Sequence, residues 1–274
     1  MVRKLIAFLM VIVLFVVSFS NSPITIKGSD TMVILVQRWA EIYMRNNPNV
    51  VIQVTGGGSG TGISALINGT TDICNSSRPM KKEEKLKLKE KYGTPGVEVK
   101  VAIDGLSIYV NQQNPIKELT IQQVKDIYTG KINNWKEIGG KDAKIIRYSR
   151  ENNSGTYVYF KEEVLQGEDF EPSTQNLPGT AAVINAVSKD INGIGYGGAA
   201  YGKGIKELKI KKDAKSPAYA PTKENIRKNL YPISRYLYMY LRQRPTGEIK
   251  KFIDWILSPE GQNIVESVGY FPIR

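Results

Sequence analysis

Residues 24–68 read ITIKGSDTMVILVQRWAEIYMRNNPNVVIQVTGGGSGTGISALIN and contain two strand–loop–helix units in succession. Residues 24–26 and 50–54 have the apolar character of buried strands. Residues 31–44 place apolar side chains at the helical period, and an Asn-Asn-Pro sequence ends that helix. A second helix is expected over 63–68. Two such units in a row predict a parallel sheet covered by helices, which is an α/β fold.

The same alternation continues downstream, where a second block of elements begins near Ala102. Strands are expected at 106–110, 144–148, 194–196 and 231–241, and helices from Thr120, after residue 155, over 180–187, over 248–257 and from Ser258. The segment 203–223 is basic, contains proline and shows no clear period. There is no internal repeat of fixed length, so a repeat architecture is not expected.

The first twenty residues differ in kind from the rest of the chain. Arg3 and Lys4 precede an apolar run at 5–19, and small residues occupy positions 18 and 20. This arrangement is typical of a secretory signal. The run is shorter than the roughly 20 residues of a membrane span, although an uncleaved anchor is the alternative. No cysteine lies near the cleavage point, so we expect an exported chain in the periplasm or outside the cytoplasm, without a lipid anchor.

The composition excludes several classes of protein. The 274-residue chain has no histidine and one cysteine, Cys74, which argues against a Ser-His-Asp triad, a zinc site and an intrachain disulfide. The chain carries a net charge of +12, which favours an anionic partner. Its lysines are scattered, and those at 81–91 alternate with glutamates as on a solvated helix, so no nucleic-acid partner is expected. We expect no enzyme, no metal and no cofactor.

Three loops share one composition, because each follows a strand, opens a helix and is rich in Gly, Ser and Thr. They are GSDT at 28–31, GGGSGTG at 56–62 and RENNSGT at 150–156. Helix N-termini hold anions through free N–H groups and the helix dipole. Glycine permits close approach, and hydroxyls add donors. One such loop also fits an ordinary helix cap. Three loops with an arginine predict a cage for a small tetrahedral oxyanion.

Nucleotide binding is the competing interpretation of the glycine loop. The loop lacks the Gly-Lys-Ser/Thr ending of a P-loop. Residues 60–65 fit a relaxed dinucleotide fingerprint, but no acidic residue follows in the expected place. The sequence therefore does not favour a nucleotide ligand.

Short distinctive stretches recur along nearly the whole mature chain. They are GSDT at 28–31, GGGSGTG at 56–62, SSRP at 76–79, IYTGKINNW at 127–135, SRENNSGT at 149–156, IGYGGAAY at 194–201, YPISRYLY at 231–238, SPEGQ at 258–262 and GYFPIR at 269–274. In this order they resemble stretches of the phosphate-binding proteins of bacterial phosphate ABC importers. The resemblance implies a periplasmic-binding-protein fold of the second topology, with two α/β lobes joined by crossing strands and the ligand between them. We expect lobe I at 24–102 plus 225–274, and lobe II at 103–224.

The resemblance also implies a set of phosphate ligands. By position they fall on Asp30, Thr31, Ser59, Arg150, Ser154, Gly155 and Thr156. Well-known members carry an aspartate just before a small residue and proline, whereas Ser77 stands there in this chain and Arg78 follows. Both are kept as candidate phosphate-binding residues, and for Arg78 the role of a salt-bridge partner is equally open.

The expected function is capture of inorganic phosphate and its delivery to the transmembrane permease subunits of an ABC importer, by a protein that is monomeric when free. A binding protein for sulfate, molybdate or another oxyanion is the main alternative. An adhesin or phosphate-sensing protein with this fold also stays open. A phosphatase is not expected, because the chain has no histidine and no metal site is visible.

The departure at Ser77 affects ligand selectivity. In the family, the aspartate accepts a hydrogen bond from the phosphate's own proton and repels fully ionised sulfate. We hypothesise that Asp30, which lies in the first loop, supplies this acceptor here. The alternative is that Asp30 only caps the following helix, since Asp is a preferred cap.

Replacing Asp30 with Asn tests this hypothesis. We expect Asp30→Asn to weaken discrimination against sulfate, because the amide can donate to an anion that has no proton of its own. Competition between phosphate and sulfate, measured by calorimetric titration, reports the effect. Unchanged selectivity would remove Asp30 from the role.

Overall fold

A computed structural model describes residues 22–273, so the predicted signal at 1–20 lies outside the described residues. The main sheet has the strand order β2-β1-β3-β12-β4-β8-β6-β7, and β9 pairs with β4 at its side. The strands are β1 (Ile24–Gly28), β2 (Ile52–Thr55), β3 (Ile73–Ser76), β4 (Val97–Val110), β6 (Ile146–Arg150), β7 (Gln175–Leu177), β8 (Gly193–Gly198), β9 (Lys206–Glu207) and β12 (Ser234–Leu241). This arrangement confirms the predicted α/β class.

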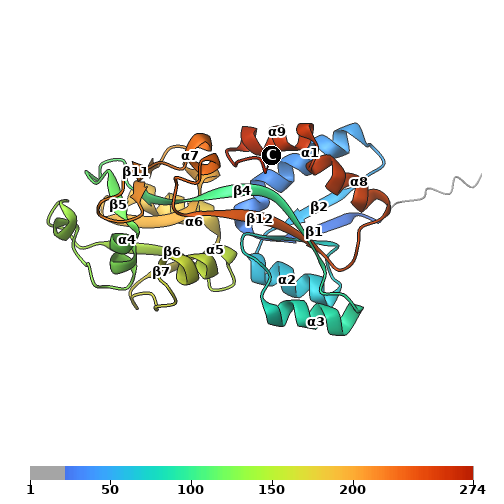
Figure 1. The fold of residues 1–274 in the computed structure, drawn as a ribbon, viewed down its shortest axis with the longest axis horizontal. Coiled ribbons are helices and arrows are strands. Elements are labelled where there is room, and N and C mark those ends of the chain that lie inside the picture. The colour runs from blue at the N-terminus through green and yellow to red at the C-terminus, as the bar shows by residue number, and fades with distance from the viewer. Residues whose placement is uncertain (1–21, 274) are drawn as a thin grey trace, which may run out of the picture.

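Two long strands connect the two ends of the molecule (Figure 1). Residues 97–105 of β4 pair with β12, and residues 106–110 of the same strand pair with β8. β12 in turn pairs with β3, antiparallel like its contact with β4. Because β4 belongs to both halves of the sheet, it and β12 are the strands that join the two lobes. The division of the chain at residues 102 and 225 stays a prediction.

The first lobe is built on the parallel pairs β1–β2 and β1–β3, as the opening stretch predicts. Its helices are α1 (Val33–Asn46), α2 (Ser59–Asn68), α3 (Lys82–Tyr92), α8 (Gly247–Ile256) and α9 (Pro259–Val268). Figure 1 shows α1, α8 and α9 on one face of the strands, and α2 and α3 on the other. Trp39 of α1 and Phe252 of α8 are fully buried in the core of this lobe. Ser258 caps α9 by accepting from the Gly261 N–H, as predicted.

The second lobe places β6 between β7 and β8, all parallel. A small sheet of β5 (Glu118–Thr120), β10 (Lys209–Lys211) and β11 (Ala218–Tyr219) lies at its end. The helices are α4 (Ile121–Tyr128), α5 (Gly155–Tyr159) continuing as a π-helical turn (Phe160–Val164), α6 (Gly179–Lys189) and α7 (Lys223–Arg227), with 3₁₀ turns at Trp135–Ile138 and Ala199–Tyr201. Thr120 caps α4, and the rings of Phe160 and Tyr196 stack with centroids 3.8 Å apart in the core.

In α2 and in residues 203–223, the structure differs from the sequence-based expectation. The helix expected over 63–68 begins at Ser59, inside the glycine loop. Glycine is a poor helix former, but a Cβ on Gly62 would come within 2.5 Å of Gly28 Cα, so close packing on β1 requires glycine in this helix. The other difference concerns residues 203–223, which showed no period yet contribute the short strands β9, β10 and β11. Strands of two or three residues are too short to produce a detectable alternation.

The helix expected from residue 31 is also divided. A 3₁₀ turn at Asp30–Met32 precedes α1, which starts at Val33. Within residues 22–273, no helix is both long and apolar enough to cross a lipid bilayer.

Cys74 provides a simple test of the packing. Its side chain is fully buried in β3, and burial raises the pKa of the thiol, so the reactive thiolate is suppressed at neutral and mildly alkaline pH. We expect Ellman's reagent to leave the folded protein unlabelled at pH 8 and to titrate one thiol per chain after denaturation. Rapid labelling of the folded protein would contradict the buried position of Cys74.

Candidate functional site

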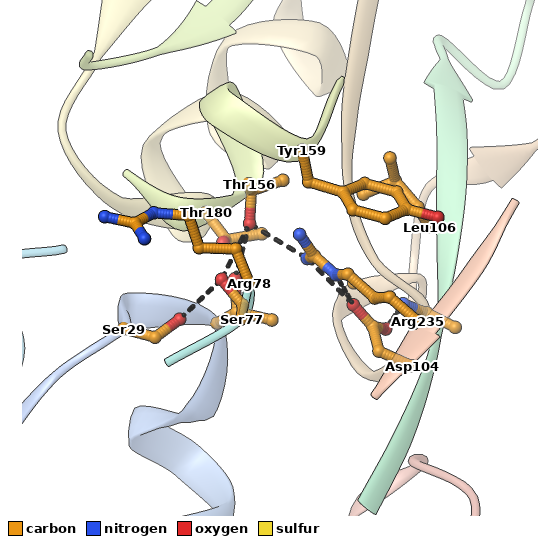
Figure 2. Close-up of polar contacts among 12 residues, drawn as sticks. Ser29, Ser77, Arg78, Asp104, Leu106, Thr156, Tyr159, Thr180 and Arg235 are labelled. Atoms are coloured by element: carbon orange, nitrogen blue, oxygen red, sulfur yellow. Dashed lines mark hydrogen bonds and ion pairs between the residues drawn. The ribbon is translucent and has the colours of Figure 1, made fainter. Parts of the chain in front are cut away.

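A cluster of buried hydroxyl groups lies where the two lobes meet (Figure 2). Thr31 Oγ1, in the turn after β1, lies 2.8 Å from Thr156 Oγ1 at the start of α5. Ser77 Oγ, just after β3, lies 3.5 Å from the same Thr156 oxygen. Segments that are distant in the sequence therefore bring their hydroxyls to a single point between the lobes.

The remaining hydroxyls extend this cluster within the first lobe. Ser29 Oγ donates to Ser77 Oγ over 3.0 Å. Ser59 Oγ, at the first residue of α2, accepts from the Ser77 N–H over 3.0 Å and lies 3.4 Å from Ser77 Oγ. All three serines are at most 2% exposed. These hydroxyls therefore lie close together at one end of the first lobe. Ser29 and Ser59 belong to the first and second predicted loops, whereas Ser77 follows β3 and lies outside the three loops.

The Ser-Gly-Thr sequence of the third loop opens α5. Ser154 caps this helix, its Oγ accepting from the Thr156 and Tyr157 N–H groups over 3.2 and 3.4 Å. A Cβ on Gly155 would collide with Ser59 Oγ and would come within 2.7 Å of Ser77 Oγ. Only glycine at this position lets the second lobe approach the hydroxyls of the first.

Arg150 is the arginine of the third predicted loop. It ends β6 and is 1% exposed. Its Nη2 donates to Asp30 Oδ2 over 2.8 Å, and its Nη1 donates to Thr180 Oγ1 over 2.8 Å. Burial lowers the pKa of Arg150 while the Asp30 carboxylate raises it, but an arginine stays charged at any pH of interest. Arg150 therefore places a positive charge between the lobes.

Asp30 has two donors in this structure. Besides Arg150, its Oδ1 accepts from the Gly57 N–H over 2.7 Å. Ser29 occupies the N-cap of the 3₁₀ turn, so Asp30 lies inside the first turn and its carboxylate joins the first two loops to Arg150. Its function as the acceptor of a ligand proton stays a prediction.

Arg78 forms a fork-shaped pair with Glu84 at the start of α3. Its Nη1 and Nη2 lie 2.8 and 2.6 Å from the two carboxylate oxygens. The structure therefore shows the salt bridge that the sequence left open for this arginine. A contact of Arg78 with the ligand stays a prediction.

Arg235 is a residue of this site that the sequence motifs did not single out. Its Nη2 donates to Thr156 Oγ1 and to Asp104 Oδ2, each over 2.9 Å. A signal for it exists in the sequence, because apolar Tyr231, Ile233 and Leu237 alternate with other residues along the strand expected at 231–241, and Arg235 falls in the same alternating row. All three apolar residues are buried in the structure, although β12 itself begins at Ser234. A charged side chain in the buried row of a strand needs a partner, and Asp104 stands directly opposite on β4. Thr180 and Ser29 were missed as well.

A cavity of about 500 Å³ opens beside this cluster, and residues of both lobes line it. They include Arg78 and Lys81 from the first lobe, Tyr159 and Glu162 from the second, and Arg235 between them. Lys81 Nζ and Glu162 Oε1 lie 3.6 Å apart across this cavity. Arg78 and Arg235 are the arginines that line this cavity, whereas the hydroxyls of the cluster are buried and do not line it.

The chemistry of the site is that of anion binding. Hydroxyls and a guanidinium supply hydrogen-bond donors, and Asp30 is the carboxylate that joins them. Among residues 22–273, no group of three or more acidic, histidine or cysteine side chains could hold a metal ion. The arrangement fits a small oxyanion bound by charge-assisted hydrogen bonds.

Comparison with known proteins agrees with this geometry. Residues 18–260 match the family model described as the PBP superfamily domain. The chain is 38% identical to the phosphate-binding protein PstS of Pseudomonas aeruginosa, over 90% of this chain and 81% of that protein.

Two solved structures are also similar. One is from Clostridium perfringens and is described as a phosphate ABC transporter substrate-binding protein with bound phosphate. Its TM-score is 0.84 at 33% identity, over 92% of this chain and 100% of that one. The other is an ABC-type phosphate transport receptor from Vibrio cholerae, with a TM-score of 0.72 at 30% identity, over 90% and 99% of the two chains. The fold, the site and these similarities together show that the chain belongs to the PBP superfamily and, within it, to the family of PstS phosphate-binding proteins.

Proposed function

We propose that this protein captures inorganic phosphate outside the cytoplasm and delivers it to the permease subunits of an ABC importer. The observation that carries the proposal is the convergence of donors from both lobes at Thr31 and Thr156. The relatives named for phosphate binding and the structure with bound phosphate support the choice of ligand. The apolar run at 5–19 supports export.

Capture proceeds without a change in any covalent bond. Phosphate enters between the lobes, and the hydroxyls of Thr31, Ser59 and Ser77 donate to it from the first lobe. The Ser-Gly-Thr loop and Arg150 donate from the second lobe as the lobes close about β4 and β12. Charge-assisted hydrogen bonds in a site shielded from water replace the hydration of the anion. The closed form is the one that we expect to dock on the permease.

Asn153 contributes contacts that hold the lobes together. Its backbone oxygen accepts from the Gly60 N–H over 2.9 Å. Its side-chain amide donates to Gly57 O over 3.1 Å and to Thr61 Oγ1 over 3.2 Å. Asn153 belongs to the loop of the second lobe, whereas its three partners lie in the glycine loop of the first. These bonds therefore stabilise the closed arrangement around a bound anion.

Phosphate differs from sulfate near neutral pH by the proton that it carries, so selectivity requires an acceptor in the site. Asp30 is the acidic side chain that joins the first two loops to Arg150. We propose that one of its lone pairs accepts from the phosphate proton, since each carboxylate oxygen can accept more than one hydrogen bond. Asp30 would then both hold Arg150 and select phosphate.

Calorimetric titration of the protein comprising residues 22–274 tests the proposed function. We expect saturable binding of phosphate, competition by arsenate, which has the same shape and protonation, and much weaker binding of sulfate at pH 7. Absence of phosphate binding at millimolar concentration would contradict the proposal. Preference for sulfate would instead favour a binding protein for another oxyanion.

Gly60 offers a test of closure that separates binding from folding. Gly60→Ala places a methyl group in α2, which should raise the free energy of unfolding by up to about 1 kcal/mol. In the arrangement seen here, where Asn153 contacts the glycine loop, the same Cβ would come within 3.1 Å of Asn153 O. We therefore expect higher thermal stability in the absence of phosphate but weaker phosphate binding.

Ser188→Ala is the control variant for Gly60→Ala, because it also introduces alanine into a helix. Ser188 is exposed in α6 and lies outside the site. Ser188→Ala should leave phosphate affinity unchanged. If Gly60→Ala binds phosphate as tightly as the natural protein, the contact with Asn153 does not form part of the closed state.

A further inference from the structure

Arg235 lies where the linking strands and the site meet, and neither the sequence motifs nor the comparisons assign it a function. It is on β12, its cross-strand partner on β4 is Asp104, and it is 6% exposed. Figure 2 shows its guanidinium between Asp104 and Thr156, beside the ring of Tyr159. The ring lies 5.1 Å from the guanidinium carbon. Arg235 thus connects the strands that join the lobes to the Ser-Gly-Thr loop.

We propose that Arg235 is a positioning residue for phosphate, acting through Thr156. This inference rests on the proposed function. A guanidinium has no acceptor atom, so in the 2.9 Å bond between them Thr156 Oγ1 must accept. The hydroxyl hydrogen of Thr156 is then directed to another oxygen. In this structure Thr31 Oγ1 lies 2.8 Å from Thr156 Oγ1, and an anion bound between the lobes would take that hydrogen instead.

The charge of Arg235 strengthens the same effect. Hydrogen bonds from an ionised donor are shorter and stronger than neutral ones, and the polarised hydroxyl becomes a better donor in turn. Asp104 is completely buried and holds the other side of the guanidinium through Nε and Nη2, at 3.1 and 2.9 Å. The Ala199 N–H fixes Asp104 from the second lobe over 3.2 Å. Arg235 is therefore held in one orientation toward Thr156.

One hydrogen-bond donor of the Arg235 side chain has no acceptor among the described residues. Nη1 of Arg235 is buried and has no hydrogen-bond partner in the described part of the chain. Arg235 also lines the cavity between the lobes. A buried charged donor without an acceptor is unfavourable, and an anion entering this site lessens that penalty. The orphaned donor is a second observation, independent of the bond to Thr156, that points to an anion near Arg235.

The test compares two variants that break the same ion pair but change the charge in opposite directions. Arg235→Met removes one positive charge, and Asp104→Asn removes one negative charge. Phosphate affinity is measured by calorimetry and the association rate by stopped flow. We expect Arg235→Met to weaken binding on the order of 10- to 100-fold, the loss of one charge-assisted hydrogen bond. Asp104→Asn should lose affinity by a clearly smaller factor, because the guanidinium remains.

The association rate distinguishes positioning by charge from a purely structural function. It should fall in Arg235→Met and rise in Asp104→Asn, because the two substitutions shift the potential in the site in opposite directions. Arg235→Lys keeps the charge without the fork and should recover part of the lost affinity. Arg242→Met is the matched control, since Arg242 follows the same strand and pairs with Asp72 away from the cluster. Its phosphate binding should equal that of the natural protein.

If both variants lose affinity equally and their association rates move in the same direction, Arg235 only supports the fold and the inference is wrong. If Arg235→Met does not fold, the comparison of Arg235→Lys with Asp104→Asn decides by the same two measurements. Natural protein that ignores phosphate would contradict the proposed function itself. Phosphate binding that persists unchanged in Arg235→Met would contradict only the function assigned to Arg235.

Discussion

The contact between Thr31 and Thr156 joins segments 125 residues apart, and the rest of the site depends on it. The two hydroxyls can meet only if the loops that carry them approach closely. Gly155 permits this approach, because any larger residue would strike Ser59. The buried cores of the two lobes hold the strands that precede these loops, and the strands in turn set the positions of the hydroxyls. Function thus follows from how two independent cores are joined.

The charges around this contact are arranged in pairs across the joint. Arg150 of the second lobe bonds Asp30 of the first, and Arg235 and Asp104 face each other on the linking strands. Each arginine also donates to a threonine, Arg150 to Thr180 and Arg235 to Thr156. A buried pair of this kind costs desolvation and contributes little to stability by itself. What these pairs do in the structure is fix the orientation of the two guanidinium groups.

Much of this could be predicted from residues 24–68 and from the three loops. Glycine, serine and threonine after a strand have a direct physical meaning, so the three loops could be singled out from their composition. Within them, Thr31, Ser59 and Thr156 were selected by the family resemblance, and their contact with the ligand stays a prediction. The α/β class followed from the alternation of strand and helix periods.

Other features depend on tertiary contacts and could not be predicted. The start of α2 at Ser59 is set by packing on β1, against the low helix propensity of glycine. The pairing of Arg78 with Glu84 depends on how the chain turns into α3. Arg235 stood in the buried row of its strand, but the identity of its partners needed the register with β4.

A crystal structure of the protein grown with phosphate tests the central claim most directly. The account predicts a tetrahedral anion within hydrogen-bond distance of Thr31 and Ser59 from one lobe and of Arg150 and the Ser-Gly-Thr loop from the other. An anion bound elsewhere, or held by the groups of one lobe alone in a closed molecule, would contradict it.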